Sequence, residues 1–318
     1  MPIDSVAAFA AAARAGSSVA LPTSGTSGIA RTVVRTARSW TDSFPAVTEL
    51  TGLTGGSRLW LPGPLSATMN LFAAVHADWV GARLVDSLQQ ATHAHLTPSR
   101  LAALLDATAD LRERTLVVAG DALPPALRRR AEQRGARVAH YYGAAELSFV
   151  AWGGDSDDLR AFPDVEIDVR DGEIWVWSAY LAEGYLDDVQ GPLRRDADGF
   201  ATVGDRGRLD VDRLIVDGRP DTILTGGATV LVADFEAAIR PAIRGQIAIL
   251  GLPHARLGQV VAAVLTDEAD REPARSSARD LGAGRPRRWF HRRDLPLTSQ
   301  GKVDRRTLAA RLAEGADE

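Results

Sequence analysis

The stretch between residues 98 and 142 constrains the fold more than any other part of the sequence. Pro98 is followed by leucines at helical spacing, and the short apolar run 115–119 has the pattern of a buried strand. Two prolines precede a second helical segment over 126–133, and an extended run over 137–141 follows it. A strand, a crossover helix and another strand form a parallel pair in a sheet covered by helices. The sequence therefore predicts an α/β fold.

The carboxyl ends of these two strands form the first candidate site. Ligands of open α/β sheets bind beyond the carboxyl ends of the strands. In this sequence the residues at those ends include Gly120, Asp121, Tyr142, Gly143 and Glu146. We therefore expect glycine, carboxylate and phenol groups to lie together at one edge of the sheet.

A change of periodicity near residue 165 predicts a second kind of structure. Apolar and charged residues alternate over 165–170, an Asp-Gly turn follows, and 174–177 is apolar, which is the pattern of a β-hairpin. Leu209 and Val211 are expected in the first strand of a second hairpin, whose other strand spans 214–216. These residues predict an antiparallel, β-rich region after the parallel sheet.

The C-terminal third predicts a smaller mixed domain. A Gly-Arg-Pro-Asp break occupies 218–221, and 267–284 is polar and linker-like. We therefore divide the chain into a large domain, 1–219, and a small, mobile α+β lid domain, 220–318, within a mixed α/β fold. The elements expected in the small domain are strands over 222–224, 246–250 and 260–265, and helices over 233–239 and from Arg305.

Composition excludes several functional classes. The absence of cysteine removes disulfides, thiolate nucleophiles and Cys-ligated metals. A formal charge of −4 argues against a nucleic-acid partner, because neutralising phosphates requires an excess of Lys and Arg. The alanine-rich N-terminus lacks the basic region of a signal peptide, and no segment reaches the ~20 apolar residues of a membrane span. We therefore expect a cytoplasmic protein.

Hydroxyl groups and glycines are concentrated in one loop near the N-terminus, made of Thr23, Ser24, Gly25, Thr26, Ser27 and Gly28. Glycine lets the backbone approach an anion, and hydroxyls and free amides donate hydrogen bonds to phosphate oxygens. The loop lacks the lysine of the Walker pattern, and Ile29 replaces the last glycine of a serine nucleophile elbow. By itself the segment is equally compatible with a phosphate-binding loop and a flexible linker.

Lysine usage singles out one residue. Of the 37 basic residues, Lys302 is the single lysine and all others are arginine. A compact ammonium group on a flexible stem can make contacts that a planar guanidinium cannot. Lys302 is therefore a candidate for a functional role, and chance survival on a solvated surface is the alternative.

Six segments recur together in one order: TSGTSGIAR at 23–31, YGAAE at 142–146, GEIWVWSAYLAEGY at 172–185, VGDRG at 203–207, GRPDTILTGGATV at 218–230 and LPLTSQGKVDRR at 295–306. Their order and approximate spacing resemble those of the adenylate-forming enzymes, which include acyl-CoA synthetases, peptide-synthetase adenylation domains and luciferases. The resemblance runs from about residue 20 to the end of the chain. The sequence around Tyr142 most resembles that of short bacterial acyl-CoA synthetases. The 2-succinylbenzoate ligases are another branch of the family with short chains.

The resemblance implies an ATP site with a magnesium ion. The hydroxyl-rich loop would hold the β- and γ-phosphates, and Tyr142 would stack on adenine. Gly120 and Asp121 would line the base. Glu146 would ligate Mg²⁺, which prefers hard oxygen ligands.

The resemblance also implies a ribose contact. Asp205 would accept hydrogen bonds from both ribose hydroxyls, and Arg219 would reach the ribose or a phosphate. Two departures concern the phosphate side: Ala30-Arg31 replaces the usual Pro-Lys, and Ala145 replaces a threonine that donates to phosphate. Losing one neutral hydrogen bond costs about 0.5–1.5 kcal/mol, so catalysis would be slowed without being abolished.

The implied reaction has two halves. Lys302 would bridge the substrate carboxylate and the α-phosphate while acyl-AMP and pyrophosphate form. Asp221 matches a hinge, about which the small domain would swing to present Gly226 and Gly227 to the thiol of CoA. The products would be acyl-CoA and AMP.

Other features support weaker hypotheses. His93 and His95 would point to one side of a strand, but with no third ligand apparent we favour structural roles over a metal pair. His140 is expected to border the acyl pocket. The basic run 285–293 is either a solvated face or a site for the phosphates of CoA, because arginine matches phosphate geometry.

We therefore expect an ATP-dependent carboxylate–CoA ligase that uses an acyl or aryl acid. The segment 62–68 has no carboxylate to hold a substrate amine, which disfavours amino acids. Only 22 residues precede the hydroxyl-rich loop, far fewer than in relatives, so we expect the first subdomain to be largely missing. The alternatives are transfer to a carrier-protein thiol and a catalytically impaired nucleotide-binding remnant. The acyl chain is undetermined, and a homodimer is compatible with the sequence.

Overall fold

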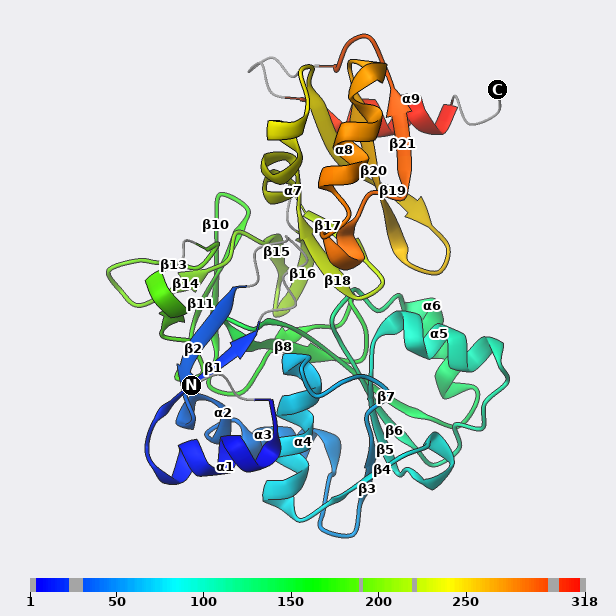
Figure 1. Ribbon diagram of the computed structural model, residues 1–318. Coiled ribbons are helices and arrows are strands. Elements are labelled where there is room, and N and C mark those ends of the chain that lie inside the picture. The colour runs from blue at the N-terminus through cyan, green and yellow to red at the C-terminus, as the bar shows by residue number, and fades with distance from the viewer. Residues whose placement is uncertain (1–3, 23–30, 189–190, 219–221, 297–302, 315–318) are drawn as a thin grey trace. The chain divides into compact units, whose positions relative to one another are not determined.

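The computed structural model describes residues 4–22, 31–188, 191–218, 222–296 and 303–314 (Figure 1). Contacts divide these residues into two compact units, one within 4–218 and the other within 222–314. The predicted mixed α/β class is confirmed. Among the described residues, none of the helices is long and apolar enough to cross a bilayer.

A seven-stranded sheet organises the first unit. Its first five strands in space are parallel, and the last two are added by antiparallel pairings, so only the sixth strand runs against the others. The parallel pair predicted from 115–119 and 137–141 is confirmed. In spatial order the strands are β4 (Arg83–Val85), β3 (Arg58–Trp60), β5 (His93–Leu96), β6 (Thr115–Val118), β7 (Arg137–Ala144), β8 (Ser148–Gly153) and β9 (Arg160–Ala161).

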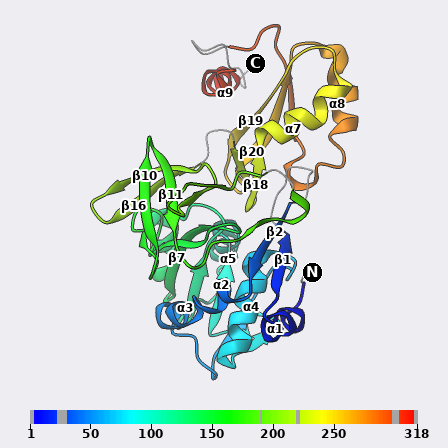
Figure 2. The same ribbon diagram turned by 90° about the vertical axis from the view of Figure 1, so that its left-hand side faces the viewer.

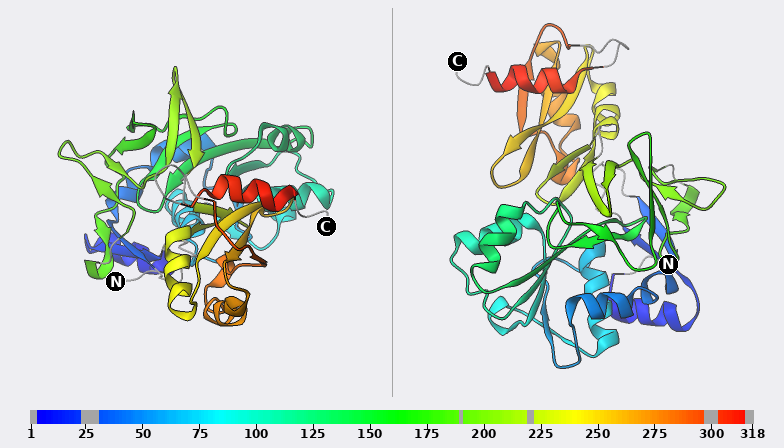
Figure 3. Two further views of the ribbon diagram at one scale, coloured as in Figure 1. Left: turned by 90° about the horizontal axis from the view of Figure 1, so that it is seen from above. Right: turned by 180° about the vertical axis from the view of Figure 1, so that it is seen from behind.

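Helices cover both faces of this sheet. On one face, α5 (Pro98–Asp106) and α6 (Pro125–Glu132) bury leucine and alanine against β5, β6 and β7. Thr97 caps α5 by accepting a hydrogen bond from Arg100 N at 3.3 Å. On the other face lie α3 (Phe44–Thr51) and α4 (Thr68–Val80), as Figures 1 and 3 show. The remaining helices of this unit are α1 (Val6–Arg14), α2 (Arg38–Thr41), η1 (Leu88–Gln90) and η2 (Leu186–Asp188).

Two antiparallel sheets complete the first unit (Figure 2). One contains β1 (Ser18–Pro22), β2 (Thr32–Thr36) and β12 (Gly184–Tyr185), and the other contains β10 (Glu166–Arg170), β11 (Glu173–Trp177), β13 (Arg194–Arg195), β14 (Ala201–Thr202), β15 (Arg206–Asp210) and β16 (Arg213–Gly218). Both predicted hairpins form. The placement of Val211 in a strand was wrong, because Val211 lies in the turn with φ of +58° and is 95% exposed.

The second unit is a small sheet with helices on both faces. Apolar residues of α7 and α8 pack on one face and those of α9 on the other (Figure 3). The interpretation of 267–284 as a linker was wrong: α8 lies within it, and Ala274, Ala278 and Leu281 are buried against α7 and the sheet. The elements are β17 (Thr222–Thr225), β18 (Ala228–Leu231), α7 (Val232–Ile239), η3 (Arg240–Ala242), β19 (Ile247–His254), β20 (Gly258–Leu265), η4 (Glu268–Asp270), α8 (Arg271–Ser277), η5 (Gly282–Gly284), β21 (Arg288–His291) and α9 (Arg305–Glu314).

Candidate nucleotide site

The predicted site residues fall into three groups. Gly120, Asp121, Tyr142, Gly143, Glu146 and Asp205 lie in the first unit, and Gly226 and Gly227 lie in the second. Outside the described residues lie Thr23, Ser24, Gly25, Thr26, Ser27, Gly28, Arg219, Asp221 and Lys302. The geometry of the site is therefore built from the first group.

Tyr142 and Asp205 are brought together although 63 positions separate them in the chain. Tyr142 lies near the end of β7, and its hydroxyl donates to Asp205 Oδ2 at 2.7 Å. Asp205 directly precedes β15, and its carbonyl accepts from Ile174 N at 2.9 Å, which fixes the loop. A carboxylate has about four lone-pair acceptor sites, one of which accepts from the Tyr142 hydroxyl.

The end of β6 turns through Gly120 into Asp121. Gly120 has φ of +87°, a conformation that side chains with a Cβ rarely adopt. Asp121 Oδ1 accepts from Ala122 N at 2.7 Å, and burial raises the pKa of its carboxyl group. These two residues therefore form a tight, partly buried edge at the carboxyl end of the strand.

Gly143 has a packing reason for lacking a side chain. It lies in β7 where the register with β8 shifts, and a Cβ there would lie 2.1 Å from Ser148 O. The β7–β8 hairpin can therefore close only with glycine at this position. The close turn holds Glu146 between the two strands.

Glu146 is buried and held in place by several contacts. Its Oε1 accepts from the Tyr185 hydroxyl at 2.8 Å, and its carbonyl accepts from Ala182 N at 2.8 Å. Burial and the neighbouring Glu146 charge raise the pKa of Tyr185, so the phenol stays protonated and donates. No group of three or more metal-ligating side chains occurs in the described part of the chain. A single carboxylate nevertheless fits Mg²⁺, because this ion is commonly held by one or two carboxylates together with substrate phosphates.

Arg35 is a charged residue near Glu146 that the sequence interpretation missed. It lies on β2, is 1% exposed, and donates to Tyr180 O at 2.5 Å. Burial lowers its pKa to about 9, and the negative charge of Glu146 opposes that shift. The signal was present in the alternation of β2, in which Arg35 shares the buried side with Val33.

Gly226 and Gly227 form the turn between β17 and β18. Their φ angles are +59° and +85°, and Gly226 N donates to Leu257 O at 3.0 Å. Positive φ at both positions accounts for the glycine pair through turn geometry alone.

The histidines divide between the two faces of the seven-stranded sheet. His93 and His95, two positions apart in β5, both line one cavity. His140 does not line that cavity; its Nδ1 lies 2.8 Å from Val118 O.

Comparison with known proteins identifies the family to which the sequence is similar. Residues 11–186 match the family described as AMP-binding enzyme. The 2-succinylbenzoate–CoA ligase of Salmonella typhimurium is 34% identical over 162 residues, which cover 49% of this chain and 35% of that protein. The medium/long-chain-fatty-acid–CoA ligase FadD8 of Mycobacterium tuberculosis is 32% identical over 271 residues. The match covers 72% of this chain and 47% of that protein. The chain thus spans less than half the length of these curated relatives.

Solved structures give the same fold. The amide bond synthetase McbA from Marinactinospora thermotolerans superposes with a TM-score of 0.75 at 26% identity. The superposition covers 92% of this chain and 68% of the McbA chain. The o-succinylbenzoate CoA synthetase MenE from Bacillus subtilis, bound to a product analogue, superposes with a TM-score of 0.78 at 22% identity. This superposition covers 92% of this chain and 69% of the MenE chain. The second likeness concerns the fold alone.

Proposed function

The chain belongs to the AMP-binding enzyme family, and from that premise we propose that it is an ATP-dependent carboxylate–CoA ligase. It would convert an acyl or aryl acid to acyl-AMP with release of pyrophosphate, and then transfer the acyl group to the CoA thiol. Relatives named as CoA ligases support this reaction class.

The observation that carries the proposal is the hydrogen bond between Tyr142 and Asp205. Two motifs far apart in the chain meet through this 2.7 Å contact, at the edge where ligands of parallel sheets bind. In the proposed complex the Tyr142 ring lies against adenine, and Asp205 accepts hydrogen bonds from the ribose hydroxyls. Gly120 and Asp121 border the base.

Glu146 is proposed to hold Mg²⁺ through the oxygen that does not accept from Tyr185. The ion would offset the charge of the phosphates, and Glu146 would contribute the single protein carboxylate that such a site needs. Tyr185 would fix the carboxylate by its hydrogen bond to Oε1. Burial lowers the pKa of Arg35 and the charge of Glu146 raises it, so the guanidinium stays protonated at neutral pH and places a buried positive charge near this carboxylate.

Lys302 is proposed to act during adenylation, by contacting the carboxylate and the α-phosphate as negative charge develops. The six residues of the hydroxyl-rich loop would bind the β- and γ-phosphates, and Arg219 the ribose or a phosphate. We propose further that residues 220–318 act as a lid that turns about Asp221. That motion would withdraw Lys302 and bring Gly226 and Gly227 to the thiol donor.

An arginine-rich cleft in the second unit supports CoA as the acceptor. It occupies about 600 Å³, and its lining includes Trp289, four arginines and one carboxylate, that of Glu272, which pairs with Arg275 at 3.6 Å; the arginines are Arg275, Arg279, Arg285 and Arg287. Guanidinium groups match phosphate geometry, and an indole offers a stacking surface for a base. The pairing fits the phosphates and adenine of CoA.

Pyrophosphate release tests the proposal. The protein is incubated with ATP, Mg²⁺ and a panel of carboxylic acids, with and without CoA. We expect release that requires an acid, and CoA consumption in step with AMP formation. Lys302→Ala should lower the adenylation rate by about 10²–10³-fold, and Lys302→Arg should not restore it, because loss of one preorganised electrostatic contact has that size. Arg306→Ala, which removes an exposed cation close by in sequence, is the matched control and should keep the rate.

The same assay separates the alternatives. Acyl-AMP formation without CoA consumption, followed by acylation of an added carrier protein, would identify a carrier-loading ligase. ATP binding without pyrophosphate release for any acid would identify a catalytically impaired nucleotide-binding protein and reject the ligase proposal.

A further inference from the structure

A serine and a histidine lie behind the loop that borders the proposed base site. The loop runs from Gly120 to Leu123 and leads into α6. Its start is tied to the sheet, because Ala119 N donates to Leu96 O at 2.9 Å. At its other end the fully buried Leu123 meets Ser156, which belongs to the segment between β8 and β9. The loop is therefore held at both ends, and Ser156 is the partner of the second end.

Ser156 and Leu123 exchange two hydrogen bonds. Ser156 N donates to Leu123 O at 3.0 Å, and Leu123 N donates to Ser156 Oγ at 2.7 Å. The first bond needs only the backbone of residue 156, whereas the second needs its hydroxyl group. Because a buried amide without an acceptor is costly, we expect the loop to loosen when the hydroxyl is removed.

His140 lies next to this hydroxyl group, on β7 and two residues before Tyr142. The histidine is 3% exposed, and its Nδ1 lies 2.8 Å from Val118 O, an atom that can only accept. Nδ1 therefore carries a proton. Burial lowers the pKa of this imidazole, so the ring is neutral at pH 7 and Nε2 is an acceptor. Nε2 lies 3.5 Å from Ser156 Oγ, and the hydroxyl can donate to it while accepting from Leu123 N.

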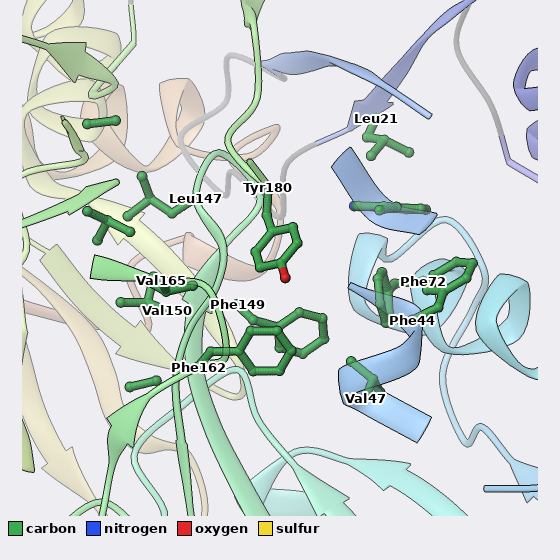
Figure 4. Packing of buried hydrophobic residues seen from close by; sticks show 14 of the residues in the cluster. Leu21, Phe44, Val47, Phe72, Leu147, Phe149, Val150, Phe162, Val165 and Tyr180 are labelled. Atoms are coloured by element: carbon green, nitrogen blue, oxygen red, sulfur yellow. The ribbon is translucent and has the colours of Figure 1, made fainter. Parts of the chain in front are cut away.

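The segment that carries Ser156 is anchored on two sides. Phe149 of β8 and Phe162, which follows β9, lie together in the core, with ring centroids 4.9 Å apart and planes 19° apart (Figure 4). The buried Asp155 lies 3.4 Å from Arg128 of α6, the helix that the loop 120–123 enters. Ser156 is thus a fixed point to which the loop is attached.

We propose that Ser156 and His140 are positioning residues for the base of the nucleotide. The inference rests on the proposed function, since it takes adenine to lie between the loop 120–123 and Tyr142. A chain of contacts runs from Leu123 through Ser156 to His140, and β7 continues from His140 to Tyr142. Both walls of the base site therefore share one support, and neither positioning residue contacts the nucleotide.

The two roles that Ser156 could have differ in which ligands they affect. A residue that only stabilises the fold would change the binding of every ligand of the site alike. A residue that positions the loop would change the contacts to the base and leave the contacts to the phosphates as they are. ATP and inorganic triphosphate separate these roles, because both carry the triphosphate and only ATP carries a base.

Calorimetric titration of the purified full chain with these two probes tests the inference. We expect Ser156→Ala to weaken the binding of ATP by about 5-fold, since one hydrogen bond has roughly that effect, and to leave the binding of triphosphate unchanged. Ser156→Thr, which keeps the hydroxyl group, should restore most of the affinity for ATP. Ser87→Ala is the matched control, because this half-buried serine precedes η1 without capping it through its side chain.

A double-mutant cycle tests whether the two residues act together. His140→Asn keeps an amide donor for Val118 O and lacks the acceptor that faces Ser156. We expect it to weaken the binding of ATP by about 2-fold in the wild-type background and to have no further effect in Ser156→Ala. Losses that simply multiply would show that His140 acts independently of Ser156, and would overturn the shared support.

The titrations keep this inference separable from the ligase proposal. A loss in Ser156→Ala that is confined to ATP would support the inference even where no acid gives pyrophosphate release. Unchanged binding of ATP, or an equal loss for triphosphate, would overturn the inference and leave the ligase proposal standing. A wild-type protein that binds no ATP would overturn both. Should Ser156→Ala fail to fold, His140→Asn is titrated with both probes and the same criteria apply.

Discussion

The two faces of the seven-stranded sheet are built differently. Under α5 and α6 the face is closed by aliphatic side chains such as Leu101, Leu116 and Val118, each no more than 1% exposed. Under α3 and α4 the same strands present imidazoles and aromatic rings around free space. One sheet thus carries a solidly packed face and a face with a small, incompletely filled cavity that three histidines help to line.

The difference shows which face is shaped by stability alone. Leaving a buried polar atom such as His95 Nε2 unpaired costs about 1–3 kcal/mol, and leucine at the same place would avoid that cost. Aliphatic side chains on the packed face gain hydrophobic and dispersion energy without such a penalty. Folding stability alone therefore explains the choice of aliphatic residues on the α5–α6 face, and it does not explain the buried histidine on the α3–α4 face.

Truncating leucine on the two faces should give the largest and most unequal effects. Leu101→Ala on the packed face should lower the free energy of unfolding by about 4 kcal/mol, because its surroundings cannot collapse into the new void. Leu59→Ala, which borders the cavity, should cost about 2 kcal/mol, because that side chain already faces free space. Urea denaturation followed by tryptophan fluorescence measures both values. Equal losses would contradict the distinction between the faces.

Acidification should weaken the cavity face selectively. His95 has a pKa of about 4 when folded, below its ordinary 6.5, so the unfolded chain binds more protons between these values. Its contribution to stability is present above pH 6.5 and is lost as the pH falls toward 4. This one group should lower the free energy of unfolding by about 2 kcal/mol between pH 7 and pH 5.

The contribution of His95 is isolated by comparing two urea-denaturation series. His95→Leu should show a flatter dependence on pH than wild type by that amount, and other titrating groups cancel in the difference. Parallel curves for the two proteins would show that His95 is not held neutral by burial.

Tyr142→Phe tests the contribution of the strand end at the nucleotide site. It removes the hydrogen bond to Asp205, worth about 1 kcal/mol, while keeping the ring that would stack on adenine. We expect the KM for ATP to rise about 5-fold with little change in selectivity among acids. An unchanged KM for ATP would show that this hydrogen bond does not contribute to nucleotide binding.

Local sequence patterns predicted the elements of this fold well, and side-chain contacts poorly. The helix from Pro98 and the parallel strands β6 and β7 follow from periodicity and proline placement, which act over short distances. The meeting of Tyr142 with Asp205 was accessible only through the resemblance of the motifs. The interpretation of 267–284 as a linker failed because the segment is largely polar, yet Ala274, Ala278 and Leu281, three or four positions apart, are buried against the rest of the second unit.

The buried polar groups were the hardest features to predict. Arg35 lies in a strand whose alternation puts it inside, but alternation cannot say which partner neutralises it. His95 was interpreted as a structural histidine because no third metal ligand was apparent beside His93 and His95. The cavity that its side chain lines depends on how α3 and α4 pack against the sheet, which is a long-range property.

The smallest effect is expected away from both faces, at the β15–β16 turn. Val211 has φ of +58°, which is strained for a β-branched residue, and 95% of it is exposed, so it gains almost nothing from packing. Val211→Asn should raise the free energy of unfolding by about 1 kcal/mol, because asparagine tolerates this conformation. Val211→Gly should gain about half as much, since glycine loses more entropy on folding. Leu209→Asn, also exposed but within β15, is the matched control and should be neutral or destabilising, because asparagine is disfavoured in strands. If both asparagine variants stabilise equally, removal of exposed apolar surface is responsible and the backbone conformation is not.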